Sequence, residues 1–166
     1  NNFLFFTNSA PYFMTRSAST LSTDEDYINL QDDKFDDFAF FLVKSAEHFC
    51  KQGFNVKYIS PINEPNGHWH TNAFQEGSFA TKADIYRMVE ELDKAISKAQ
   101  IDTKILIPEV GDMKYLFEID SVARIPDDII HSMFYKDGQY SVLKFKNLYN
   151  CVAAHDYWSA YPDTLL

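Results

Sequence analysis

The sequence predicts an α/β fold of parallel strand–helix units, on two observations. Short, almost continuously apolar runs begin at Phe3, Val56, Lys104 and Cys151, separated by 53, 48 and 47 residues. Such runs are typical of strands that are covered on both faces of a parallel sheet. Amphipathic patterns with helical spacing occupy the first two intervals, as expected for the crossover helices that join parallel strands.

The first helical pattern covers residues 35–49 and the second covers residues 85–99. In both, apolar residues recur at intervals of three and four, which predicts helices that bury one face. Gly53 is placed to end the first helix, and Thr81 with Asp84 resembles a capping box at the start of the second. The third interval predicts only shorter helical pieces, at residues 115–119, 127–135 and 140–148.

Composition and charge exclude several classes of partner. The chain of 166 residues carries a net charge of −9, which argues against nucleic acid, an anionic membrane surface or a strongly acidic polysaccharide. No apolar run is long enough to insert into a membrane. The acidic residues between positions 24 and 37 are interpreted as a solvated loop and favourable charge at a helix start, with a calcium site as the alternative. Cys50 and Cys151 are expected to be buried free thiols, although a disulfide stays open.

The first candidate catalytic residue is Glu64, which follows the apolar run at residues 56–59 in the segment Asn63-Glu64-Pro65. A carboxyl group at the end of a buried strand is held rigidly and faces a cleft, as proton-transfer catalysis requires. Pro65 removes a backbone donor, so the strand cannot continue regularly. Asn63 can direct an amide towards the group on which the carboxyl acts. The alternative interpretation is a strand that ends in a polar turn.

The loop at residues 66–77 combines aromatic rings, amides and imidazoles, a mixture that suits sugars. Four segments, spread over nearly the whole chain, carry a likeness to known enzymes: Asn8-Ser9-Ala10-Pro11-Tyr12-Phe13-Met14-Thr15, Ser60-Pro61-Ile62-Asn63-Glu64-Pro65, Gln75-Glu76-Gly77 and His155-Asp156-Tyr157-Trp158. Together and in this order they resemble glycoside hydrolase family 30, and most closely its endo-β-1,6-galactanase-like branch.

The resemblance implies a (β/α)8 TIM barrel of which residues 1–166 form about half, holding strands three to six of one catalytic domain. Eight units at this spacing would need about 400 residues. It also implies hydrolysis of a β-linked, galactan-like neutral polysaccharide with retention of configuration. Glu64 would be the acid/base, and Asn63 would hydrogen-bond the sugar 2-hydroxyl. The family's nucleophile is a Glu at the end of strand seven, and no segment of this chain matches it.

Several further residues are candidates for substrate contact. Glu109 follows the third apolar run and would line the same face, with a capping or ion-paired carboxylate as the alternative. His155 and Tyr157 end the fourth run, where a satisfied core histidine is the alternative. The remaining candidates are Asn8, Trp69, Gln75, Glu76 and Trp158. The two tryptophans could stack on sugar rings or pack loops. The alternative role of Gln75 and Glu76 is to brace the loop.

No cofactor and no metal are expected. His68 and His70 could suggest zinc, but no further ligand cluster with metal spacing accompanies them. The resemblance implies a secreted or periplasmic protein, and a chain that opens with Asn1 is what a mature or trimmed product would show. The remaining half of the barrel, or a self-association partner, is expected to cover the exposed sheet edges.

Two other function classes stay open. The chain could be a non-catalytic carbohydrate-binding fragment, since it keeps aromatic and amide residues but lacks a matched nucleophile. It could instead be a small open-sheet α/β domain that binds a ligand at its strand ends. The sequence disfavours the second, because no glycine-rich phosphate loop is found and the chain has only five glycines.

Overall fold

The computed structural model describes residues 1–23, 26–69, 75–118 and 129–157. The strands are β1 (Asn2–Phe6), β2 (Asn55–Ser60), β3 (Lys104–Ile105), β4 (Pro108–Val110) and β5 (Ala153–Ala154). The α-helices are α1 (Phe35–Lys51), α2 (Lys82–Ala99) and α3 (Ile129–Phe134). Short 3₁₀ turns are η1 (Tyr12–Met14), η2 (Asp32–Lys34) and η3 (Met113–Leu116). The predicted order of strands and crossover helices is confirmed.

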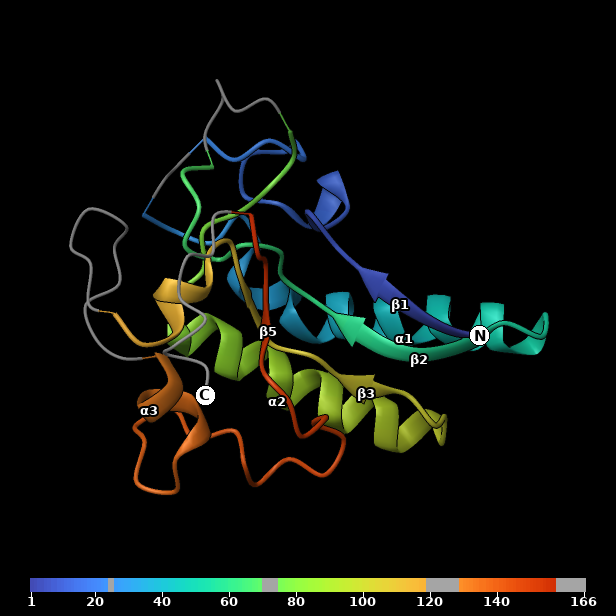
Figure 1. Cartoon of the computed structure of the whole chain (residues 1–166). Coiled ribbons are helices and arrows are strands. Elements are labelled where there is room, and N and C mark those ends of the chain that lie inside the picture. The colour runs from blue at the N-terminus through green and yellow to red at the C-terminus, as the bar shows by residue number, and fades with distance from the viewer. Residues whose placement is uncertain (24–25, 70–74, 119–128, 158–166) are drawn as a thin grey trace.

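All paired strands run parallel. β1, β2 and β3 form one sheet in that order, and β4 pairs with β5. Helices α1 and α2 pack against each other and against the strands, as Figure 1 shows. Parallel strands joined by helices place their carboxyl ends at one edge, which is where the functional residues of such folds lie. The predicted fold class is therefore confirmed.

The helical stripes form the core. Phe35 and Leu42 of α1, and Met88 and Leu92 of α2, are almost completely buried against Ile59 of β2. Full burial of a side chain of this size stabilises the fold by about 1.5–3 kcal/mol. Thr81 accepts a hydrogen bond from the backbone of Asp84, and the Asp84 carboxylate accepts one from the backbone of Thr81, so the predicted capping box is present.

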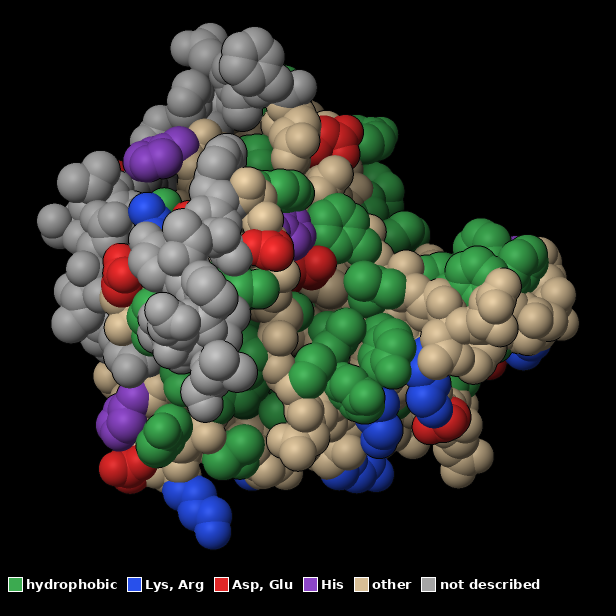
Figure 2. Space-filling view, in the orientation of Figure 1, with side chains coloured by type: hydrophobic (Ala, Val, Ile, Leu, Met, Phe, Trp, Pro, Cys, Tyr) green, Lys and Arg blue, Asp and Glu red, His purple; other side chains and the backbone are tan. Residues whose placement is uncertain are grey.

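β1 departs from the expectation of strands covered on both faces. Phe3 and Leu4 expose 42% and 43% of their surface, and Figure 2 shows hydrophobic side chains gathered over this strand. β1 is an edge strand that pairs only with β2 among the described residues, so its outer edge and one face are left open. The rings of Phe3 and Phe54 pack edge to face, at 5.4 Å between centroids.

The third predicted strand and the connection that follows it both differ from the prediction. The apolar run at 105–107 divides, because Pro108 has no backbone N–H and β4 moves on to pair with β5. The helical piece predicted at 140–148 is wrong. There the chain folds back onto α3, and the N–H groups of Tyr140 and Val142 donate to the carbonyls of Ser132 and Met133. In the described structure this segment forms turns.

Three smaller expectations can be compared with the structure. Both cysteines are free, but Cys151 is exposed and Cys50 only half-buried, so the expectation of buried thiols is wrong. The acidic residues Asp36 and Asp37 lie in the first turn of α1, as predicted for favourable charge at a helix start. Within the described ranges, no helix is both long and apolar enough to cross a bilayer.

Candidate active site

Three side chains from three strand ends meet at the carboxyl edge of the sheet. Glu64 follows β2, Glu109 lies in β4 and His155 follows β5. Nδ1 of His155 lies 2.7 Å from Oε1 of Glu64, and its Nε2 lies 3.7 Å from Oε1 of Glu109. The first contact is a hydrogen bond, and the second is an electrostatic contact beyond hydrogen-bonding distance. The imidazole therefore lies between two carboxyl groups.

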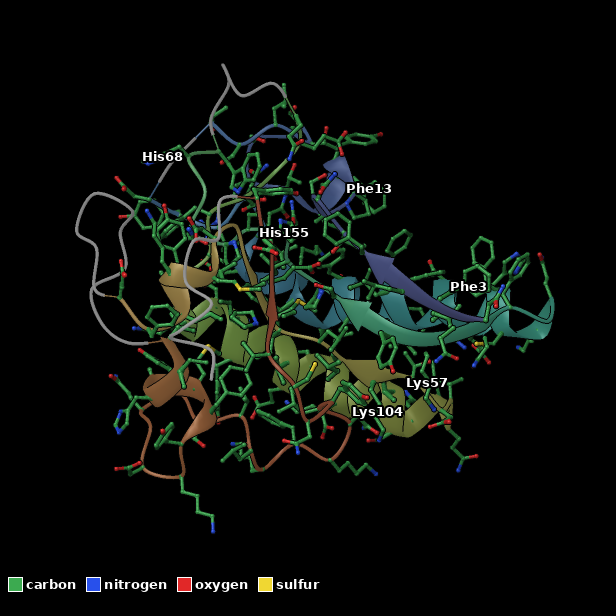
Figure 3. The ribbon with its side chains drawn as sticks, viewed as in Figure 1. Phe3, Phe13, Lys57, His68, Lys104 and His155 are labelled. Carbon is green, nitrogen blue, oxygen red and sulfur yellow. The ribbon has the colours of Figure 1, made fainter. Side chains whose placement is uncertain are left out.

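The ring of His155 is held in place by aromatic neighbours. Tyr157 packs edge to face against it, with 4.9 Å between ring centroids. The ring of Phe6 in β1 is tilted relative to the imidazole, with 6.2 Å between centroids. The backbone N–H of His155 donates to the carbonyl of Val110. Figure 3 shows His155 at the end of the β5 ribbon, among the ends of the other strands. The position of the imidazole is thus determined by both its backbone and its ring.

The backbones of the two glutamates are also linked. The N–H of Glu64 donates to the carbonyl of Glu109 at 3.0 Å. Both residues have positive φ, 45° for Glu64 and 53° for Glu109, where a side chain with a Cβ is strained. Only two other non-glycine residues in the described part of the chain have positive φ. Strain of this kind costs about 1–3 kcal/mol and concentrates at functional sites.

Gly111 provides space beside the Glu64 carboxyl group. A Cβ at this position would lie 3.2 Å from Cδ and 3.3 Å from Cγ of Glu64, closer than most such contacts. The N–H of Gly111 points to the Asn66 side-chain oxygen at 3.4 Å. The sequence analysis did not identify Gly111 as a site residue. Its position two residues after a strand-end glutamate was the available signal.

The electrostatics of the site differ between the two carboxyl groups. Burial raises the pKa of Glu109 to about 7, against the opposing effect of His155, and the nearby Glu64 raises it further. The Glu109 side chain is only 9% exposed, whereas those of Glu64 and His155 are each 17% exposed. Oε2 of Glu109 is buried without a hydrogen-bond partner. Glu109 therefore holds a proton at neutral pH far more readily than an ordinary carboxyl group.

Glu64 opens onto a pocket of about 600 Å³. The residues that line it are Glu64, Asn66, Gly67, His68, Gln75, Gly111, Tyr115 and Tyr157. Carboxyl, amide, imidazole and phenol groups converge there, which suits a polar ligand with an apolar face. Three sequence candidates, Glu64, Gln75 and Tyr157, share this pocket. Tyr115 was missed, because its sequence position indicated only a short helix.

Trp69 does not present its indole to the pocket. Its side chain is buried, and Nε1 donates to the Glu64 carbonyl oxygen at 2.9 Å. A Cβ on Gly77 would come within 2.2 Å of the indole ring, and one on Gly67 within 2.6 Å. Two glycines thus make room for the ring. Of the two roles that the sequence left open, this geometry favours packing of the loop over stacking on a sugar.

Three further candidates, Asn63, Asn8 and Glu76, are not among the residues that line the pocket beside Glu64. Asn63 is buried, its N–H donates to the carbonyl of Thr7 at 3.2 Å, and its Oδ1 has no hydrogen-bond partner. Asn8 also has a buried, unpaired Oδ1, and it lines a separate, much smaller cavity with Asn29. Glu76 is exposed and accepts a hydrogen bond from Ser9 at 3.2 Å. Two of the three thus have a buried side-chain oxygen without a hydrogen-bond partner.

Two sequence candidates lie outside the described residues, namely Trp158 and the second histidine of the zinc alternative, His70. Among residues that are described, no group of three or more His, Cys, Asp or Glu side chains could hold a metal ion. The row of Glu64, His155 and Glu109 places an imidazole between two carboxyl groups. Groups of these types can transfer protons to or from a ligand.

The sequence model of O-glycosyl hydrolase family 30 matches residues 1–166 of the chain. No curated protein matches it. Among solved structures, a conserved exported protein from Bacteroides fragilis is 87% identical, with a TM-score of 0.92 over 99% of this chain and 34% of that one. The identity and the TM-score together indicate the same local architecture in both chains.

Two more distant structures share the fold. The endo-β-1,6-glucanase BT3312 is 17% identical, with a TM-score of 0.66 over 94% of this chain and 32% of that one. A glycoside hydrolase family 30 subfamily 8 xylanase from Clostridium acetobutylicum is 15% identical, with a TM-score of 0.58 over 94% of this chain and 33% of that one. The chain thus spans about a third of the length of each of these three structures.

Proposed function

The chain belongs to O-glycosyl hydrolase family 30, and on that premise we propose that Glu64 is the acid/base of a retaining glycosidase that cleaves a β-linked neutral glycan. One observation carries the proposal. The Glu64 carboxyl group is held between the His155 imidazole and Gly111 while it faces an open, polar pocket. A half-buried carboxyl group fixed at a cleft is what proton transfer to a bound sugar requires.

In the proposed reaction, Glu64 acts first as an acid and then as a base. Glu64 gives its proton to the glycosidic oxygen while a second carboxylate, supplied outside these 166 residues, bonds to the anomeric carbon. The departing sugar leaves with that proton. A water molecule then attacks the anomeric carbon, the Glu64 carboxylate takes a proton from the water, and the second carboxylate is released. Residues 1–166 form one part of the catalytic domain in this proposal.

Asn63 is proposed to hydrogen-bond the sugar 2-hydroxyl. Its buried, unpaired Oδ1 supports a role that awaits a ligand, because buried polar atoms are seldom left without a partner. Gln75 and Tyr157, which line the pocket, are proposed to contact the sugar next to the bond that is cleaved. Asn8, Glu76 and Trp158 are proposed as contacts further out, and Trp69 as the brace of the Glu64 loop.

The galactan preference is a further proposal, which rests on the segment Gln75-Glu76-Gly77. The fold is shared with an endo-β-1,6-glucanase and with a xylanase, so a panel of neutral β-linked polysaccharides is the appropriate screen. Secretion or export to the periplasm is proposed as well. It is supported by the similarity to an exported protein from Bacteroides fragilis.

The deciding experiment replaces Glu64 with Gln in the intact protein. Turnover of a natural glycan, whose leaving group needs a proton, should fall about 10²–10⁴-fold. Turnover of a dinitrophenyl glycoside should fall far less in its first step, because that leaving group departs without protonation. Glu91→Gln, on α2 in an ion pair with Lys94, is the matched control and should keep full activity. Equal effects of Glu64→Gln on both substrates would overturn the assignment.

A further inference from the structure

Glu109 lies beside the candidate active site but does not line its pocket. Its side chain is the most buried of the three in the row. The sequence suggested a direct contact between Glu109 and the substrate. The geometry points elsewhere, because Oε1 of Glu109 lies 3.7 Å from Nε2 of His155.

The His155 imidazole can couple the protonation state of Glu109 to that of Glu64. A neutral imidazole carries one proton, so one ring nitrogen donates and the other accepts. At 2.7 Å, Nδ1 of His155 and Oε1 of Glu64 must share a proton. Which of the two supplies it depends on whether Nε2 is also protonated, and Nε2 faces Glu109. Among the described residues, the titratable side chain of Tyr157 also packs against this ring.

We propose that Glu109 is a positioning residue that acts through His155. It fixes which imidazole nitrogen carries the proton, and thereby the protonation state of Glu64. The proposal rests on Glu64 as the acid/base. With Glu109 ionised, Nε2–H faces its carboxylate, and Nδ1 accepts the proton of the Glu64 carboxyl group. With Glu109 protonated, its hydroxyl faces the Nε2 lone pair, and Nδ1–H donates to the Glu64 carboxylate. The two arrangements hold the same number of protons, so the protonation state of Glu109 is coupled to that of Glu64.

Two further observations support this role. The strained positive φ at both Glu64 and Glu109, and the hydrogen bond between their backbones, hold the two carboxyl groups in a fixed relation. The raised pKa of Glu109, about 7, means that this carboxyl group exchanges its proton near neutral pH. A carboxyl group that served only as a structural ion pair would instead stay ionised over this range.

The experiment uses the intact enzyme with Glu109→Gln, which keeps the size and polarity of the side chain but cannot ionise. We expect kcat to fall about tenfold while KM changes less than about twofold, since no substrate contact is lost. The pH profile of kcat/KM should shift. The ¹⁵N-detected titration of His155 should change, because the group that faces Nε2 can no longer ionise. Glu91→Gln should change none of these quantities.

A double-mutant cycle with His155→Gln separates action through the imidazole from any direct effect. If Glu109 acts through His155, Glu109→Gln should have almost no further effect on kcat in the His155→Gln background. An undiminished effect there would overturn the proposal, and so would an unchanged His155 titration in Glu109→Gln. The titration needs no turnover. It therefore tests the Glu109–His155 link even if Glu64→Gln shows that the acid/base assignment is wrong.

Discussion

The indole Nε1 of Trp69 donates a hydrogen bond to the backbone carbonyl of Glu64, five residues earlier in the chain, at 2.9 Å. The same carbonyl accepts from the N–H of Gly67 at 2.8 Å. Together these bonds close a tight loop around a residue whose φ is strained. The buried tryptophan therefore stabilises the backbone that carries the candidate acid/base.

Trp69→Phe tests this arrangement. Phenylalanine keeps an aromatic ring but cannot donate, so we expect the free energy of unfolding to fall by about 1 kcal/mol or more, measured by urea denaturation. Tyr135→Phe, at an exposed aromatic residue, should change it by less than about 0.5 kcal/mol. If Trp69 instead stacked on the sugar, its replacement would raise KM and leave the stability unchanged.

Gly111→Ala should displace the Glu64 carboxyl group by a few tenths of an ångström, because the new Cβ would lie 3.2 Å from Cδ. Since proton transfer depends on alignment, we expect kcat to fall about tenfold in the intact enzyme, with a smaller change in KM. Ala83→Ser, which adds one heavy atom at an exposed position of α2, is the control. Full activity in Gly111→Ala would show that the carboxyl group does not need this space.

The stability of the protein should depend on pH through Glu109. Its folded pKa of about 7 lies above its ordinary value of 4.5, so the folded state binds the proton more tightly than the unfolded state. The stabilisation from this proton is complete below pH 4.5 and is lost as pH rises through about 7. Relative to Glu109→Gln, the wild-type protein should lose up to about 3 kcal/mol of unfolding free energy across this window.

Denaturation at several pH values, with both proteins measured in parallel, checks this prediction. The difference between the two unfolding free energies should grow steadily from pH 4.5 to about pH 7.5. A constant difference over the whole range would mean that Glu109 is ionised in the folded protein as it is in the unfolded one.

Residues 1–166 produced on their own should self-associate through β1. The strand exposes Phe3, Leu4 and Phe6 along an edge that pairs with no other described strand. Open apolar edges promote association, and lysine at an edge opposes it. We expect Leu4→Lys to increase the monomer fraction in sedimentation velocity, whereas Phe13→Lys, at an exposed residue of η1, should have little effect. A monomeric unmodified chain would contradict the prediction.

Local patterns predicted the elements well because their causes are local. The apolar stripes of α1 and α2 and the capping box at Thr81 depend on spacing within one helix, and the structure confirms them. The prediction failed at residues 140–148, where the segment forms turns and its first residues hydrogen-bond to the carbonyls of Ser132 and Met133 in α3. Periodicity within the segment cannot report these contacts, because they are made with another element.

For the candidate site, the sequence by itself determined that a carboxyl group follows a buried strand at Glu64 and that a second carboxyl and an imidazole end later strands. Strand ends can be recognised in the sequence, because an apolar run marks the strand and a proline constrains only the residues next to it. Only the tertiary structure decided that His155 bonds Glu64 across 91 residues and that Glu109 stands behind the imidazole. It also decided that Trp69 turns inward. These relations depend on how parallel strands are brought together by their crossovers, and no spacing along the chain encodes them.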